Sequence, residues 1–192
     1  MCTFVNIKHK KHITIKQFQR LNKIESNEDI ETRILQASIL SDTPTDTLKA
    51  MELPKLAKFV NDTIDSYDFD FKPKNHKETI MVNGTKYYIV SDMHKIIAGQ
   101  LMDLSTYAKN EEEVIDNLHY IVAILLRENK KEYSGETLDD RALLMQDYCS
   151  YNDIYDVAVF FCKILTKLQP LLEEMMRKSL LATSNDGDGS FI

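Results

Sequence analysis

Turn-forming residues are scarce in this chain of 192 residues, which contains only 5 glycines and 4 prolines. An all-β fold needs many tight turns, so this scarcity argues against one. Long apolar runs are missing too. The two longest, residues 121–126 and 157–162, have six residues each, whereas a membrane-spanning helix needs about twenty. The N-terminus also lacks the hydrophobic stretch of a signal peptide, so we expect a soluble protein made inside the cell.

Cysteines and catalytic motifs are equally sparse. Cys2, Cys149 and Cys162 have no metal-site or disulfide spacing, and a small, odd number of cysteines is typical of free thiols in a reducing compartment. The sequence contains neither a glycine-rich phosphate loop nor a Gly-x-Ser-x-Gly nucleophile motif. We therefore predict a non-enzymatic protein with no catalytic, metal or cofactor site.

Acidic residues outnumber basic ones except at the N-terminus, where residues 1–24 contain six basic residues and no acidic one. The remainder has 18 basic and 30 acidic residues, which gives a charge of −12 there and −6 overall. An acidic surface repels nucleic acid, so the basic segment is the one place that would contact phosphate or an acidic partner. The candidate contact residues are Lys8, Lys10, Lys11, Lys16 and Arg20.

Two helices are predicted first. Residues 13–25 form one, because Thr14 and Gln17 have the spacing of a capping box. Residues 28–40 form the next, with acidic residues in its first turn, where the helix dipole favours them. The residues predicted to face inward are Ile15, Phe18, Leu21 and Ile24 in the first helix and Ile30, Ile34, Leu35 and Ala37 in the second.

Prolines mark two further helix starts. Pro44 predicts a short helix with Thr43 as its cap and Pro44 as its first residue, and Pro54 begins a helix that runs to about Tyr67. An Asp- and Lys-rich connector without periodicity follows at residues 68–78. The inward positions of the helix after Pro54 are Leu56, Ala57, Val60 and Ile64.

A β-hairpin is the strongest local signal. Residues 79–82 and 85–90 flank Asn83-Gly84, the preferred two-residue turn of a hairpin. A lone hairpin is marginal in water, so its apolar face must lie on helices or on another chain. The turn would place Ile80 opposite Tyr87 and Val82 opposite Thr85, with Ile80, Val82, Tyr87 and Ile89 on one face.

Two helices are expected after the hairpin. Asp92 would cap a helix that runs to about Lys109. The next would span residues 111–128 and should be central, because its middle is apolar on all sides. A short third strand is possible at residues 131–133. The inward positions of the first of these helices are Ile97, Leu101, Leu104 and Ala108.

The last part of the chain is also predicted to be helical. Thr137 would cap a helix at residues 138–148, and Asn152 would cap a final helix that extends to about Ala182. Pro170 should kink that helix, because proline removes a backbone hydrogen bond. Its predicted apolar stripe consists of Ile154, Val157, Ala158, Phe161, Leu165 and Leu168.

Together these elements predict a mainly α (α+β) fold, a helical bundle with one short antiparallel β-hairpin. Residues 1–12 would be a basic arm and residues 13–67 a helical subdomain. The connector at 68–78 would lead to residues 79–183, the hairpin with its helical bundle. Residues 184–192 would be a flexible tail.

Several clusters of potential ligands were weighed against ordinary structural roles. His9 and His12 lie three residues apart, but a zinc site needs three or four ligands, so we interpret them as part of an exposed arm. Asp65, Asp68 and Asp70 could bind calcium and more simply form a helix end and a solvated loop.

Three further features also receive structural interpretations. His119 lies in an apolar helix with no nucleophile or orienting acid identified beside it, so it is interpreted as a packed histidine. Cys149 and Cys162 are interpreted as buried, inert thiols. Residues 184–190 resemble the start of a calcium-binding loop, but the glutamate such a loop needs at its twelfth position is missing.

A family resemblance is carried by residues 94–104, which read His-Lys-Ile-Ile-Ala-Gly-Gln-Leu-Met-Asp-Leu directly after the hairpin. Residues 118–126 and 157–162 continue the pattern. This order resembles a family of small tailed-bacteriophage proteins, from crAss-like phages and their relatives, encoded among the virion and tail genes. Across the matched pattern, Gly99 would permit close helix packing, Gln100 and Asp103 would tie neighbouring loops, and Leu104 would be structural.

The resemblance implies a non-enzymatic virion structural protein of the neck or tail region, or of its packaged contents. Such a protein would be made in the bacterial host cytoplasm and located in the virion, with other virion proteins as partners and a possible homo-oligomer. The alternatives are a tail-assembly chaperone absent from the mature particle and a nucleic-acid-binding regulator that uses residues 8–20. Glu28, Asp29 and Glu31 disfavour the regulator, because acids at the start of a recognition helix repel phosphate.

Overall fold

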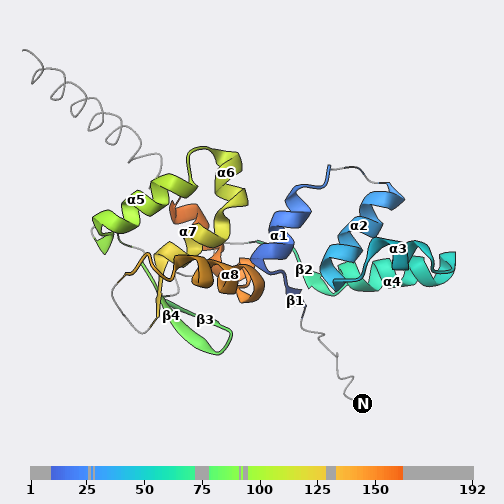
Figure 1. Ribbon diagram of the computed structural model, residues 1–192. Coiled ribbons are helices and arrows are strands. Elements are labelled where there is room, and N and C mark those ends of the chain that lie inside the picture. The colour runs from blue at the N-terminus through green and yellow to red at the C-terminus, as the bar shows by residue number, and fades with distance from the viewer. Residues whose placement is uncertain are drawn as a thin grey trace, which may run out of the picture.

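Helices dominate the structure, a computed structural model shown in Figure 1. It describes residues 10–25, 27, 29–71, 78–90, 92, 95–128 and 133–161. The prediction of a mainly helical α+β fold with an antiparallel hairpin is confirmed. In chain order the labelled elements are β1 (Lys11–His12), α1 (Ile15–Asn22), α2 (Ile30–Ser41), α3 (Thr45–Lys49), α4 (Leu53–Asp65), β2 (Tyr67–Asp68), β3 (Thr79–Val82), β4 (Thr85–Ile89), α5 (Ala98–Tyr107), α6 (Glu111–Asp116), α7 (Leu118–Leu125), β5 (Leu126–Glu128) and α8 (Leu138–Tyr148). A further helix covers residues 151–161.

Helix α1 lies between two groups of elements (Figure 1). On one side α2 packs against α3 and α4 around a small apolar cluster that includes Ala37 and Leu48. On the other side α1 contacts α7 and α8, and its fully buried Ile15 belongs to the larger cluster. The first helix therefore shares its core with elements far along the chain, although the sequence groups it with residues 13–67.

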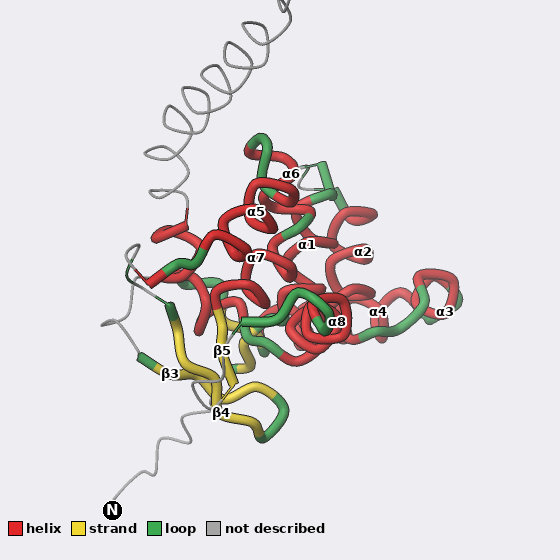
Figure 2. Tube along the Cα trace, turned by 60° about the vertical axis from the view of Figure 1, so that its left-hand side comes forward, coloured by secondary structure: helices red, strands yellow, loops and turns green. Residues whose placement is uncertain are grey.

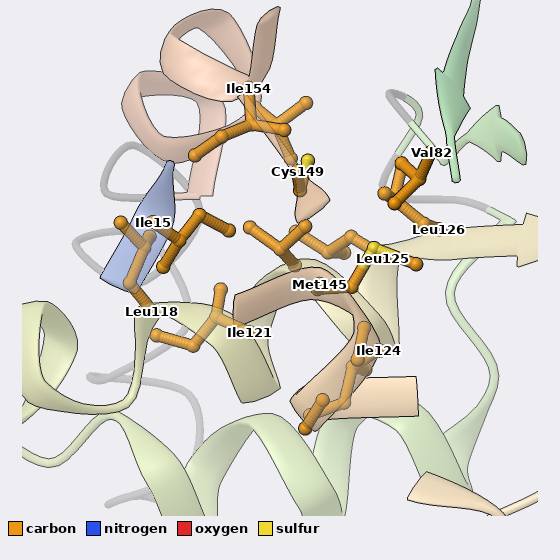
Figure 3. Close-up of a cluster of buried hydrophobic side chains, with 14 of the residues drawn as sticks. Ile15, Val82, Leu118, Ile121, Ile124, Leu125, Leu126, Met145, Cys149 and Ile154 are labelled. Carbon is orange, nitrogen blue, oxygen red and sulfur yellow. The ribbon is translucent and has the colours of Figure 1, made fainter. Parts of the chain in front are cut away.

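Helix α7 occupies the middle of the larger cluster, as its all-round apolar sequence predicts. Residues 121–125 are all 0% exposed. Figure 3 shows Ile121, Ile124 and Leu125 of α7 around Met145 of α8, with Ile154 of the last helix next to Cys149. Burial of these side chains supplies the main favourable term for folding.

The α1 cap forms as its sequence predicts. The Thr14 hydroxyl accepts a hydrogen bond from the Gln17 amide at 3.1 Å, and the Gln17 side chain accepts one from the Thr14 amide at 2.9 Å. The capping box therefore satisfies two backbone donors at the helix start.

The hairpin register is confirmed: Ile80 pairs with Tyr87 and Val82 with Thr85. Ile80, Val82 and Tyr87 are buried. Figure 2 shows strands β3, β4 and β5 together to one side of the helices, and α8 contacts β3. The apolar hairpin face is therefore covered by this chain's own helices.

The hairpin turn gives a direct test of backbone conformation. Asn83 and Gly84 have φ values of 47° and 78°, a left-handed conformation that suits glycine and disfavours β-branched residues. We expect Gly84→Val to lower the free energy of unfolding by about 1–3 kcal/mol, measured by urea denaturation. Asn83→Gly should change it little, and equal effects of the two substitutions would rule out this explanation.

The prediction of one helix over residues 111–128 is wrong at two points. It breaks at Asn117, whose side chain donates to the Tyr107 carbonyl at 3.1 Å. It then ends at Leu125, and residues 126–128 form β5 against β4. Strand pairing thus overrides helical sequence at the end of the segment. The third strand lies here, not at 131–133; residues 131 and 132 lie outside the described residues, and Tyr133 is not in a strand.

Helix α5 begins later than predicted. Ile97, not Asp92, is its N-cap residue and is 48% exposed, so its assignment to the inward face is wrong. The Ile97 amide donates to the Gln100 side chain at 3.3 Å. Leu104 is buried as predicted; Ala108 is also buried but follows the helix.

Other local predictions also require correction. Ile30, Leu35 and Ala57 are exposed, not inward. Pro44 is the N-cap of α3, not its first residue, so the helix begins one residue later than predicted. Asn152 lies inside its helix, buried, instead of capping it. The predicted kink at Pro170 lies outside the described residues.

Strands β1 and β2 form a short parallel pair that no periodicity indicated. In it, Lys11 pairs with Tyr67 and His12 with Asp68. Among the helices that the structure describes, none combines the length and apolar character needed to cross a membrane.

Candidate interaction site

Three of the five predicted basic contact residues lie beside other groups of this chain. The Lys16 ammonium lies 2.9 Å from an Asp147 carboxylate oxygen, and an Arg20 guanidinium nitrogen lies 3.8 Å from Asp42. The Lys11 ammonium lies over the Tyr67 ring, 5.8 Å from its centroid.

The remaining members are Lys10, which is exposed, and Lys8, which lies outside the described residues. Lys23 of the same basic segment also faces an acid, Asp116, at 2.8 Å. Each of these exposed pairs contributes little to stability. In these pairs, acidic residues of this chain lie beside the basic side chains that would otherwise contact the phosphates of a nucleic acid.

Gln100 is a buried connector between α5, α7 and β5. Its side-chain amide donates to the Ile124 carbonyl at 2.7 Å. Its oxygen accepts from the Ile97 amide and from the Arg127 guanidinium. Since Gln100 is 0% exposed, these bonds replace those it would make with water. The resemblance implied that Gln100 ties neighbouring loops, whereas its partners here belong to the start of α5, to α7 and to β5.

Asp103 performs the same role one turn later, because it accepts a hydrogen bond from the Tyr133 hydroxyl. Burial is the largest cause that raises the pKa of Tyr133. The hydrogen bond to Asp103 and the negative charge of Asp103 raise it further. The Arg141 guanidinium lies 5.3 Å from the centroid of the Tyr133 ring. Leu104 is 1% exposed in the core. These contacts fix the segment before α8 against α5.

Gly99 does not have the predicted packing role. It is exposed, and an added Cβ would meet no atom within 4 Å. The match of Gly99 to the family pattern therefore has no packing explanation in this structure.

His119 is half-buried within a glutamine network. The Gln19 amide nitrogen lies 3.1 Å from His119 Nδ1 and 2.7 Å from the Asp116 carbonyl oxygen. The Gln146 side chain donates to the Gln19 oxygen at 3.1 Å. Burial lowers the pKa of His119. Gln19 is itself buried, so the network links α1, α7 and α8 inside the fold.

This histidine should make stability depend on pH. Its pKa is lowered below the ordinary value of 6.5, so the unfolded chain binds a proton more readily than the folded chain. Its contribution is fully present above pH 6.5 and is lost as the pH falls from there toward the folded pKa. We expect His119→Gln to flatten the fall in unfolding free energy on acidification, measured by urea titrations.

The matched control for this titration is His12→Gln, at an exposed histidine of β1. It should retain the slope of the unmodified chain. If His119→Gln left that slope unchanged, burial of His119 would not be its cause.

The other candidate ligands behave as structural residues. Cys149 is buried, and burial, with a smaller effect of Asp153, raises the pKa of its thiol to about 12. Its neutral thiol is therefore a poor nucleophile. The Asp68 carboxylate accepts from the Asp70 amide at 3.0 Å within the loop. In the part of the chain that the structure describes, no three His, Cys, Asp or Glu residues gather as a metal site would require. Cys2, Cys162, His9 and residues 184–190 lie outside that part.

An open apolar pocket lies between α1, α2, the end of α4 and the segment after β2. Its volume is about 440 Å³, within the range of typical ligand pockets. Asn22 and Gln36 are the polar residues of its lining. Its apolar lining consists of Ile13, Phe18, Leu21, Leu40, Ile64, Phe69 and Phe71.

Aromatic packing builds one wall of this pocket. Phe18 stacks on Tyr151 with ring centroids 3.7 Å apart, and Phe71 meets Tyr151 edge-on at 4.9 Å. Phe69 meets Phe71 edge-on at 6.5 Å and remains 42% exposed. Such pairs favour a defined ring geometry, so the wall is formed before any partner binds.

Sequence reasoning missed this pocket because Phe69 and Phe71 fell in the predicted connector. The available signal was the alternation Tyr67-Asp68-Phe69-Asp70-Phe71, which places every second, aromatic residue on one side of an extended chain. The fold class is thus a helical body with a small sheet and an aromatic-walled apolar pocket. No protein-family model, curated protein or solved structure matches the chain.

Proposed function

We propose that this chain is a non-enzymatic bacteriophage virion structural protein of the neck or tail region, or of its packaged contents, and that it works through protein–protein contacts. The observation that carries the proposal is the open apolar pocket, whose wall holds a 42% exposed Phe69. Exposed apolar surface around a preformed pocket favours binding of another protein. The phage setting rests on the sequence resemblance around residues 94–104.

The groups with shifted pKa values support a role in protein binding and not in catalysis. Perturbed groups that gather in one cleft are typical of catalysis. Here Tyr133 is explained by burial and Asp103, His119 by burial among glutamines, and Cys149 by burial in the core. None of the three lines the apolar pocket.

The direct test is mass spectrometry of purified particles of the phage that encodes this chain. A structural protein should be present in a fixed copy number relative to known virion proteins. Particles that lack the chain altogether would contradict this assignment.

The same pocket also suits a tail-assembly chaperone, because a chaperone shields apolar surface on its client and then leaves. That alternative predicts a complex with unassembled tail protein in infected cells and no chain in finished particles. Affinity purification from cells before particle completion, paired with the particle analysis, distinguishes the two.

A further inference from the structure

We propose that the apolar pocket binds residues 163–181 of a second copy of this chain. This inference rests on the proposed function, because it names a first protein partner. It concerns self-association alone, however, so its failure would leave a role in the particle intact. The observation that carries it is the aromatic wall of the pocket, where Phe69 is exposed and Phe71 is half-buried.

The proposed occupant has a continuous apolar stripe. Leu165, Leu168, Leu172 and Met175 are spaced by three, four and three residues, which places them on one face of a helix. By its spacing in the sequence, the stripe would extend the face of the last described helix that is buried at Ile154, Val157 and Phe161 if the helix continued. Such a stripe requires cover, and side chains of this size match a pocket of about 440 Å³.

Charge complementarity favours the same occupant. The pocket edge at residues 65–71 contains three aspartates and no basic residue. The basic side chains of Lys16 and Arg20 on the neighbouring α1 already lie beside acids. Residues 163–181 contain four basic and two acidic residues, so their positive charge suits this edge.

Chain geometry points to a second copy. The helix of residues 151–161 begins beside the pocket, where Tyr151 stacks on the pocket residue Phe18. Residues 162–169 contain no Gly, Pro, Asn or Asp, so the sequence predicts continued helix. At 1.5 Å per residue, residue 169 would lie about 27 Å from Tyr151. In the helical form that the stripe requires, the six residues from there to Met175 span only about 9 Å. Met175 would therefore lie at least about 18 Å from Tyr151, too far to enter the same pocket.

The test is site-specific photo-crosslinking in the full chain, with a benzoylphenylalanine at position 69. Equal amounts of isotopically light and heavy protein are mixed, unfolded, refolded together and irradiated. The proposal predicts cross-links from position 69 to residues 163–181 that join light to heavy chains. Cross-links confined within single chains, cross-links to other segments, or none would each overturn it.

A variant pair tests the contact without changing the pocket. Leu172→Asp with Met175→Asp should raise the dissociation constant for self-association at least about tenfold, since two large apolar side chains lose their burial. Thr166→Asp with Lys167→Gln changes the net charge by the same two units at positions off the stripe and should leave self-association near that of the unmodified chain. Sedimentation equilibrium measures both, and unchanged association of the stripe variant overturns the proposal.

Discussion

Replacing Gln100 by leucine is expected to lower the free energy of unfolding by about 2–4 kcal/mol. The leucine fits a similar volume but leaves the Ile124 carbonyl without its donor and the Arg127 guanidinium without its acceptor. Gln100 is 0% exposed, so water cannot replace these bonds at no cost. The cost arises from buried polar groups left unpaired, not from lost volume.

Urea denaturation followed by circular dichroism measures this effect. Thr106→Leu, at an exposed position of the same helix, is the matched control and should stay within about 0.5 kcal/mol of the unmodified chain. If Gln100→Leu were equally mild, Gln100 would not hold α5 to α7 and β5 as described.

Truncating Ile121 to alanine should have a comparable effect, a loss of about 2–5 kcal/mol of unfolding free energy. The side chain is 0% exposed in the centre of the larger cluster, where its removal leaves a cavity and forfeits buried apolar surface.

Met102→Ala removes a side chain that is 69% exposed on α5 and serves as the comparison, with an expected change within about 0.5 kcal/mol. Thermal unfolding of the two variants in parallel measures the difference. Similar transition temperatures would show that α7 is not the centre of the core.

Local sequence signals were sufficient where one residue type sets a backbone conformation. Asn83-Gly84 predicted the turn and the full pairing register of the hairpin. Thr14 and Gln17 predicted a cap that forms with both hydrogen bonds. The apolar surround of α7 likewise predicted its burial. For the turn and the cap the decisive interaction lies within a few residues along the chain, whereas α7 was predictable because a helix that is apolar on all sides must be buried.

Long-range interactions explain the failures. Residues 126–128 form a strand because β4 offers a pairing edge, and no local pattern records that edge. Helix α2 has apolar residues on more than one side, so periodicity alone could not show that Ile30 and Leu35 are exposed while Ile34 is buried. The β1–β2 pair is too short to have a recognisable period.

The candidate site likewise has features that local sequence predicts and features that depend on long-range contacts. The family resemblance implied that Gln100 and Asp103 tie neighbouring loops, and the structure gives the partners of both residues. The sequence also indicated a basic segment, but the acids that face Lys16 and Arg20 come from α8 and the end of α2. The pocket forms only where α1, α2, the end of α4 and the segment after β2 meet. Of its features, only the alternation around Phe69 can be recognised in the sequence.

Incorporation of paired pocket variants into phage particles tests the central claim most directly. Phe69→Ser removes the exposed wall of the pocket, and Leu53→Ser changes a leucine that is 66% exposed at the start of α4 and does not line it. Both proteins should unfold at similar urea concentrations. The particles come from phage whose only copy of the gene encodes the variant. We predict that quantitative mass spectrometry will find a normal copy number of the Leu53→Ser chain per particle and strong depletion of the Phe69→Ser chain. Full incorporation of a folded Phe69→Ser chain would show that the pocket is not the surface through which this protein is recognised.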